Sequence, residues 1–209
     1  MAQASGGRSY DRFISFSDAV VAVAATVLIL PIVDIAAPKA GENVGGVLLT
    51  NFNGIYSYLV TFIVIVIFWR VHHRILEGTS AYDGRLLILN TAWLATIAFL
   101  PWPTAMLGQE GGFARGVGTF YFGTLAFSTM ILLVMQIHIR RTPELWEDPN
   151  AAPASRLSRS ITYMALWTFL AVLSLTMAEK MAVISWVLFV LGVVSLAVFL
   201  VMSRRRRAA

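Results

Sequence analysis

Residues 13–35 read FISFSDAVVAVAATVLILPIVDI, and only two of these side chains, Asp18 and Asp34, carry a charge at neutral pH. A helix that crosses a bilayer needs about 20 consecutive, mostly apolar residues. The apolar core of a cleavable signal peptide is shorter, about 7–15 residues, and would not contain an aspartate. We therefore expect a membrane-spanning helix here rather than a cleaved leader.

The composition of the chain is that of a membrane protein. Of its 209 residues, 58% are hydrophobic and 13% are charged, whereas a soluble domain carries roughly 25% charged residues. The chain has no cysteine, which excludes disulfides, thiolate metal sites and cysteine nucleophiles. A net charge of +5 would suit a nucleic-acid partner in a soluble protein, but in so apolar a chain we interpret it as a topology signal.

Five further apolar runs follow the first, each bounded by charged residues, glycine or proline. Runs of this length favour helices, because barrel strands show about ten residues of alternating hydrophobicity instead. The predicted spans are residues 13–35, 52–71, 86–106, 117–139, 161–178 and 181–202. We predict an all-α integral membrane protein with six transmembrane helices, in which residues 1–209 form a single domain.

The arginines predict the orientation of these spans. If the N-terminus is cytoplasmic, only Lys39, Arg115 and Lys180 of the 16 basic residues face outward, which leaves 13 inside. This distribution satisfies the positive-inside rule and makes both termini cytoplasmic. The arginines at 204–207 can also contact anionic lipid, although we favour a stop-transfer role for them.

The first span has two different faces. At 100° per residue, one face of the helix holds a stripe of residues that all lie within about 40° of a single line along its axis. These residues are Arg12, Phe16, Ala19, Val23, Val27, Leu30 and Asp34. Thr26 flanks this line, and Asp18 lies almost opposite to it. Taken alone, a stripe of small and branched side chains indicates helix packing more often than pore lining.

Asp18 lies within the membrane, where a carboxylate requires polar partners. Candidate donors come from the end of the second span and the start of the third. The predicted structural and gating network consists of Arg12, Phe16, Ser17, Asp18, Trp69, His72, His73 and Asn90. We favour a structural role, locking three helices together, over catalysis or ion binding, and the sequence does not decide between the two histidines. Adjacent histidines without a third ligand are a weak metal signal, and we expect no bound metal.

The motif Arg12-Phe-Ile-Ser-Phe16-Ser17-Asp18 resembles the signature of the transmembrane protein 175 family. This family comprises endosomal and lysosomal potassium channels of animals and smaller prokaryotic relatives. Its hallmark is Arg-x-x-x-Phe-Ser-Asp at the start of the first helix, and all four fixed positions match. The specific part of the resemblance covers about twenty residues, and Trp69, the two histidines and Asn90 are also similar.

The resemblance implies a potassium-permeable channel with the first helix of each subunit lining the pore. Animal chains carry two six-helix repeats and form dimers, so a single-repeat chain would form a homotetramer in a prokaryotic plasma membrane. Selection and gating would fall on Val23, Val27 and Leu30, with Thr26 as a polar layer. The family commonly has Ile and Leu where this chain has the two valines. The carbonyl filter Thr-Val-Gly-Tyr-Gly is absent, and the resemblance implies no cofactor.

Other functions are less compatible with the sequence. An intramembrane hydrolase needs a nucleophile with its base or a metal site, and neither Gly-x-Ser-x-Gly nor His-Glu-x-x-His occurs. We therefore expect no enzymatic activity and no small-molecule substrate. A secondary transporter remains an alternative, although the chain shows neither a midplane charge nor an internal repeat. Proton permeation through the same pore is a further alternative.

Overall fold

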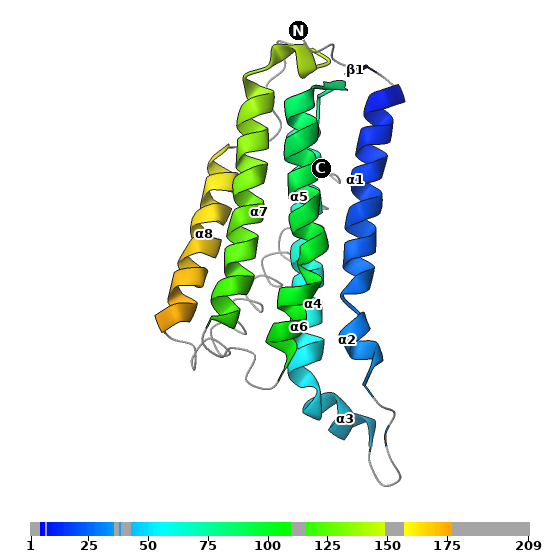
Figure 1. Ribbon diagram of the computed structural model, residues 1–209, viewed down its shortest axis with the longest axis vertical. Helices are drawn as coiled ribbons and strands as arrows, with labels where there is room; N and C mark the ends of the chain where they lie inside the picture. Colours follow the sequence, from blue (N-terminus) through cyan, green and yellow to red (C-terminus); the bar gives the residue numbers. More distant parts are fainter. Residues whose placement is uncertain are drawn as a thin grey trace, which may run out of the picture.

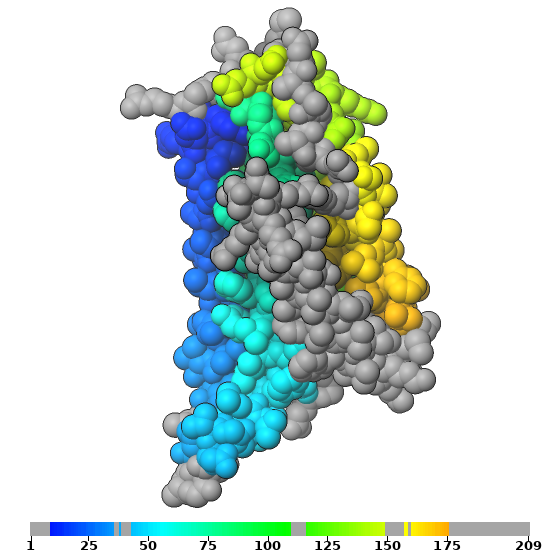
Figure 2. Space-filling view, turned by 180° about the vertical axis from the view of Figure 1, so that it is seen from behind, coloured from blue at the N-terminus to red at the C-terminus, as the bar shows by residue number. Residues whose placement is uncertain are grey.

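The computed structural model describes residues 5–6, 8–35, 38, 43–109, 116–148 and 157–176. Long helices stand side by side, with α1 and α8 at opposite edges of the bundle (Figures 1 and 2). The helices are α1 (Arg8–Val27), α2 (Leu30–Val33), α3 (Val44–Thr50), α4 (Phe52–Leu76), α5 (Gly84–Phe99), α6 (Pro101–Gly108), α7 (Val117–Arg140) and α8 (Leu157–Thr176). Two short strands, β1 (Ser5–Gly6) and β2 (Ala81–Tyr82), and the 3-10 helix η1 (Pro143–Leu145) complete the described elements.

Four helical segments are long and apolar enough to cross a membrane, judged by length and composition. They are Ser9–Val33, Phe52–Leu76, Gly84–Gly108 and Val117–Arg140. These four segments fall on the first four predicted spans. A shorter apolar helix, Ser160–Leu175, overlaps the fifth predicted span. The sixth predicted span, residues 181–202, lies outside the described residues.

The long helices alternate in direction along the chain. The start of α1, the end of α4, the start of α5 and the end of α7 all lie at one end of the bundle (Figure 1). Arg12, Arg74, Arg85, Arg140 and Arg141 belong to these helix ends, so we call this the basic end. The short helix α3 lies at the opposite end. The alternation is what successive membrane crossings require.

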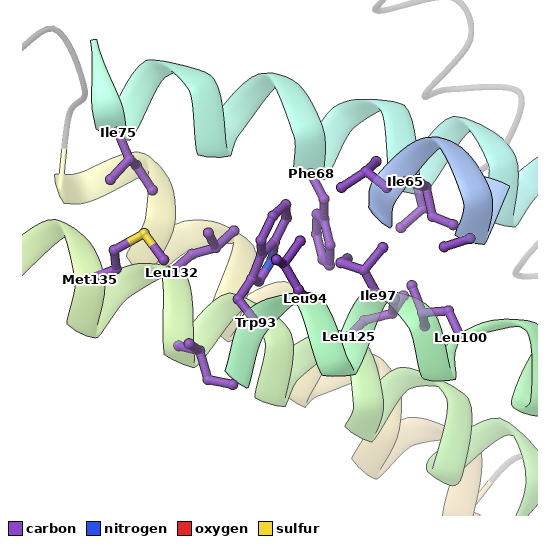
Figure 3. Packing of buried hydrophobic residues seen from close by; sticks show 14 of the residues in the cluster. Ile65, Phe68, Ile75, Trp93, Leu94, Ile97, Leu100, Leu125, Leu132 and Met135 are labelled. Atoms are coloured by element: carbon purple, nitrogen blue, oxygen red, sulfur yellow. The ribbon is translucent and has the colours of Figure 1, made fainter. Parts of the chain in front are cut away.

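The core lies between α4, α5 and α7 (Figure 3). Phe68 of α4, Trp93 and Ile97 of α5 and Leu132 of α7 are almost completely buried there. Hydroxyl and amide side chains add hydrogen bonds between neighbouring helices, as lipid cannot satisfy them. These bonds are Thr61–Tyr121 at 2.9 Å, Thr96–Ser128 at 2.9 Å and Ser160–Gln136 at 2.9 Å.

Two predicted spans are not continuous helices. The first breaks at Leu28–Ile29, between α1 and α2, and the third breaks at Leu100, between α5 and α6. Each break precedes a proline, Pro31 or Pro101. Proline has no N–H to donate, and its ring clashes with the carbonyl four residues earlier, so the helix cannot continue unchanged. Each predicted span is still one long apolar segment, Ser9–Val33 or Gly84–Gly108, and the breaks are a feature that hydropathy did not predict.

The basic end carries contacts that hydropathy did not predict. Strand β1 pairs antiparallel with β2, with Ser5 opposite Tyr82. The segment around η1 is tied to the α4–α5 turn by backbone bonds from Ser80 N–H to Leu145 O and from Glu147 N–H to Gly78 O, both 3.0 Å. Gly78 has a φ of 85°, a conformation that favours glycine. The start of α1 therefore contacts a folded turn.

Candidate functional site

The first helix presents an apolar face that its own bundle leaves uncovered. Phe16 is 61% exposed, Val23 61%, Leu30 57% and Val27 38%. The other face is buried against the core through Phe13, Ser17, Val21, Ala24 and Leu28. The two faces that the helical wheel predicted are thus both present in α1. A contiguous exposed apolar surface of this kind requires lipid or a protein partner.

Thr26 lies on the exposed side of α1, between Val23 and Val27. Its hydroxyl donates a hydrogen bond of 2.8 Å to the carbonyl oxygen of Val23. With its proton held by the backbone, the hydroxyl oxygen presents lone pairs rather than a donor. Thr26 can therefore attract a cation.

Open grooves flank α1 on both sides. On the α5 side, a groove of about 280 Å³ is lined by Ala19, Val20, Val23, Ala24, Val27 and Ala98. On the α4 side, a groove of about 350 Å³ is lined by Asp18, Val21, Ala22, Ala25, Ile65, Val66 and Trp69. Both grooves are lined by apolar side chains, apart from Asp18 and Trp69 in the second groove. Val23 and Val27, two of the pore residues predicted from the sequence, therefore lie beside unfilled apolar space.

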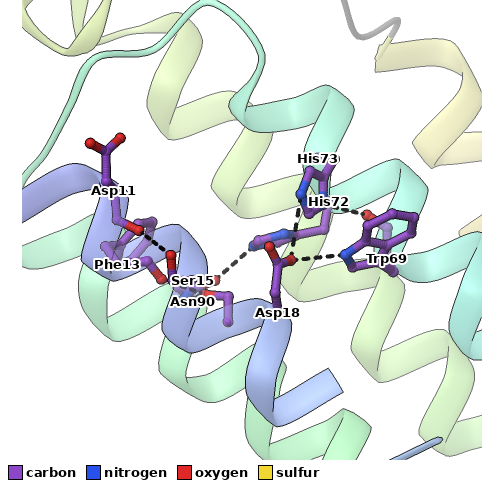
Figure 4. A network of polar contacts seen from close by, with 9 residues as sticks. Asp11, Phe13, Ser15, Asp18, Trp69, His72, His73 and Asn90 are labelled. Atoms are coloured by element: carbon purple, nitrogen blue, oxygen red, sulfur yellow. Dashed lines mark hydrogen bonds and ion pairs between the residues drawn. The ribbon is translucent and has the colours of Figure 1, made fainter. Parts of the chain in front are cut away.

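Asp18 contacts two side chains of α4 (Figure 4). The Trp69 indole N–H donates to its carboxylate at 2.9 Å, and His73 Nε2 lies 3.4 Å from the same oxygen. His73 Nδ1 faces the Trp69 carbonyl at 3.2 Å. Both ring nitrogens thus face acceptors, and they can donate to both only when the imidazole is protonated. This branch of the network ties α1 to α4.

A second, fully buried branch joins α1, α5 and α4. The Asn90 amide donates to Ser17 Oγ at 2.8 Å, and its oxygen accepts from His72 Nε2 at 2.8 Å. His72 also stacks on Trp93, with ring centroids 4.2 Å apart and planes 5° from parallel. The Ser17, His72 and Asn90 side chains are each 1% exposed. Both histidines therefore have polar partners, each in a separate branch.

The structure does not bring all predicted network residues together. No bond joins Arg12 to Asp18 in the part of the chain that the structure describes, and Asn90 reaches Ser17 instead of Asp18. Six residues at 100° each place positions 12 and 18 about 120° apart, which explains the separation. Arg12 and Phe16 are exposed on the uncovered face. Within the described residues, no group of three His, Cys, Asp or Glu side chains could hold a metal ion.

The sequence reasoning missed a polar contact at the basic end. His138 Nε2 of α7 lies 2.9 and 3.0 Å from the two carboxylate oxygens of Asp83, which also accepts from Leu86 N–H at 2.7 Å. Burial raises the pKa of Asp83, but these hydrogen bonds and the charges of His138 and Arg85 outweigh it, so the pKa is lowered. Asp83 lies three residues before Leu86, at the start of an apolar run, which is the typical position of a helix N-cap. This signal could have drawn attention to Asp83.

Fold and site together define a class of protein: a helical membrane protein whose first helix turns an apolar, proline-broken face away from its own bundle. A family model described as "Endosomal/lysosomal potassium channel TMEM175" matches residues 12–101. A potassium channel of Streptomyces collinus is 34% identical over 154 residues, covering 71% of this chain and 73% of that relative. The chain belongs to the TMEM175 family, which confirms the resemblance drawn from the first helix.

Two further comparisons bear on the fold and the family. The endosomal/lysosomal proton channel TMEM175 of Gallus gallus is 32% identical over 119 residues, which are 56% of this chain but 23% of that relative. The crystal structure of a lysosomal potassium-selective channel TMEM175 homolog from Chamaesiphon minutus matches with a TM-score of 0.58 at 22% identity. The match covers 85% of this chain and 96% of the Chamaesiphon chain. At this level of identity, the similarity shows that the two chains share a fold. Membership of an ion-channel family agrees with the expectation that the chain is not an enzyme.

Proposed function

We propose that this protein is a potassium-permeable channel in which four copies surround the pore with α1. The observation that carries the proposal is the uncovered face of α1, where Val23, Val27 and Leu30 are all exposed although the chain has a buried core elsewhere. The Streptomyces relative is named a potassium channel, which supports the same ion here. Permeant potassium is the substrate, and conduction of this kind requires no cofactor.

The grooves on both sides of α1 support assembly from identical subunits. In a closed ring, one flank of each subunit meets the opposite flank of the next. The groove beside α5 and the groove beside α4 offer two such flanks around one helix. Lipid would cover the outer helices, so the partners we propose are the other three subunits and membrane lipid.

The proposed conduction path alternates apolar and polar layers. Four copies of Val23, Val27 and Leu30 would form stacked rings, and an apolar constriction blocks ions by dewetting when it is narrow. Four Thr26 hydroxyls would supply oxygen between the first two rings, with their protons bonded to Val23 carbonyls. Slight widening would wet the rings and admit cations. Phe16 and Arg12 would line the mouth at the basic end.

The two polar branches would hold the pore helix in register. One branch fixes Asp18 to Trp69 and His73, and the other fixes Ser17 to Asn90 and His72. Because both attach α1 near the basic end, the proline-broken half of the helix would be freer to move. We assign these residues a structural and gating role.

We propose six spans within one domain, with both termini in the cytoplasm of a prokaryotic cell and the protein in its plasma membrane. The gathering of arginines at the basic end of the described helices supports this orientation. Proton conduction through the same path is the second candidate, because the Gallus gallus relative is named a proton channel.

Purified protein in liposomes tests the two candidates together. We expect a potassium gradient to dissipate passively, without a co-ion gradient, while a pH dye records any proton flux. Val23→Asn should change the rate or the ion preference. Val134→Asn is the matched control, because Val134 is 44% exposed on α7, away from the proposed pore. Equal currents from both variants would refute the pore assignment, and flux that requires a co-ion would support a transporter.

A further inference from the structure

The break between α1 and α2 alters the hydrogen bonds of the backbone beside the proposed pore. In an unbroken helix, the Val27 carbonyl would accept from the N–H of residue 31. That residue is Pro31, which has no N–H. The neighbouring donors go elsewhere: Ile29 N–H bonds to Thr26 O at 3.2 Å, and Ile32 and Val33 N–H both bond to Ile29 O, at 2.8 and 3.1 Å. Val27 O thus loses its helical donor.

This carbonyl lies on the uncovered face of α1. A helical carbonyl points along the axis toward residue i+4, so the Val27 oxygen lies between the Val27 and Pro31 side chains. Both of these side chains are exposed, whereas the adjacent Leu28 is 2% exposed and faces the core. The oxygen is therefore on the same side as Val23 and Leu30.

An unsatisfied carbonyl cannot face hydrocarbon at low cost. Irregular backbone at membrane depth is tolerated where it is buried in protein or lines a water-filled cavity. A nearby hydroxyl can also compensate for a proline, but Thr26 already donates to Val23 O, four positions before Val27. The Val27 carbonyl therefore needs another partner, such as water or a cation, beside α1.

We propose that Pro31 frees the Val27 carbonyl to coordinate a partly dehydrated potassium ion on the channel axis. This inference rests on the proposed function. Carbonyl oxygens replace the hydration shell of potassium in channels, and unwound helices supply such oxygens to cations in transporters. Four Val27 carbonyls and four Thr26 hydroxyls would form adjacent oxygen layers inside the apolar stripe. Selection for potassium would then depend on the backbone at a proline break.

The chain contains its own control for this proline. Pro101 follows Leu100 as Pro31 follows Leu30, and it breaks the helix between α5 and α6. There the Ile97 carbonyl, which lacks its donor for the same reason, accepts from Leu100 N–H at 3.2 Å. Ile97 and Leu100 are both fully buried. The two carbonyls therefore differ: Ile97 O has a replacement donor in the core, whereas Val27 O accepts none of the backbone hydrogen bonds found outside the regular helices of the described residues.

Pro31→Ala restores an N–H that can bond to Val27 O, and Pro101→Ala makes the same change in the core. In liposomes, we expect Pro31→Ala to lower the ratio of potassium to sodium flux about tenfold, a loss typical of one polar interaction. Pro101→Ala should keep the wild-type ratio. If Pro31→Ala also keeps it, or if both variants lose it equally, the coordination proposal is overturned.

A second measurement on the unmodified protein does not depend on conduction. The assigned carbon-13 signal of the Val27 carbonyl should shift when KCl replaces choline chloride, while the Ile97 carbonyl signal stays unchanged. An unchanged Val27 signal overturns the inference even if potassium flux is measured. Absence of flux with a shifted Val27 signal would instead refute the channel function and retain the cation site.

Discussion

Asn90 connects the pore helix to the rest of the bundle. Its amide group uses both ends, donating to Ser17 and accepting from His72, and all three side chains are buried. Asn90→Leu keeps the volume but leaves the His72 N–H without an acceptor. We expect a loss of about 1–3 kcal/mol in the free energy of unfolding, measured by denaturant titration in detergent.

Asn53→Leu is the matched control for this change. Asn53 is exposed near the start of α4, at the end of the bundle far from Asn90. Its replacement should alter the free energy of unfolding by less than about 0.5 kcal/mol. Similar losses from the two variants would mean that the buried network adds nothing beyond the general cost of removing an amide.

The lowered pKa of Asp83 predicts how the stability of the fold depends on pH. Its folded-state pKa lies below the ordinary value of about 3.9, so its contribution is present above that value and is lost as the pH falls through the lowered pKa. The melting temperature of the wild type should exceed that of Asp83→Asn at pH 6. The difference should shrink as the pH falls below the ordinary aspartate pKa and the Asp83 carboxylate becomes protonated.

Glu144→Gln separates this effect from the general titration of carboxylates. Glu144 lies exposed in η1 at the same end of the bundle. Its variant should follow the wild-type melting curve across the whole range. Parallel curves for wild type and Asp83→Asn would show that the contacts of Asp83 with His138 and Leu86 do not stabilise the fold.

At the scale of the element, hydropathy predicts where helices lie better than how they end. The first four spans and the two faces of α1 follow from apolar length and a 3.6-residue period, which are properties of local sequence. The break before Pro31 also had a local signal, but the run of apolar residues concealed it. The pairing of β1 with β2 and the hydrogen bond from Asn90 to Ser17 join residues more than 70 positions apart, which no local pattern specifies.

The crossing of α4 and α6 depends on two glycines. A Cβ placed on Gly108 would lie 3.0 Å from the Gly54 Cα, closer than an ordinary contact. Small residues allow such close approach between membrane helices. Gly108→Ala should therefore force the helices apart and cost about 1–3 kcal/mol in the free energy of unfolding.

Gly123→Ala gives the opposite expectation within α7. A Cβ on Gly123 meets no atom within 4 Å, so the substitution adds helix propensity without a clash. We expect it to raise the free energy of unfolding by up to about 1 kcal/mol. If both alanine variants shift the unfolding midpoint in the same direction, the close crossing does not limit stability.

At the scale of the whole molecule, the alternating directions of the helices and the positions of the arginines predict the same membrane topology. The positive-inside rule assigns the basic end to the cytoplasm and α3 to the outside. Because the chain has no cysteine, a single introduced thiol is the one position of this protein that a thiol reagent labels. Leu49 of α3 is 76% exposed, and Glu144 is exposed at the basic end, so both positions accept a reporter.

We expect an impermeant maleimide to label Leu49→Cys in intact cells and to label Glu144→Cys only after the cells are opened. The number of crossings between the two positions is odd if each of the three long apolar segments from α4 to α7 spans the bilayer once. Labelling of both thiols in intact cells would require an even number, and would show that one of these segments does not cross. Labelling of Glu144→Cys alone would invert the orientation and place the Asp18 network at the outer face of the membrane.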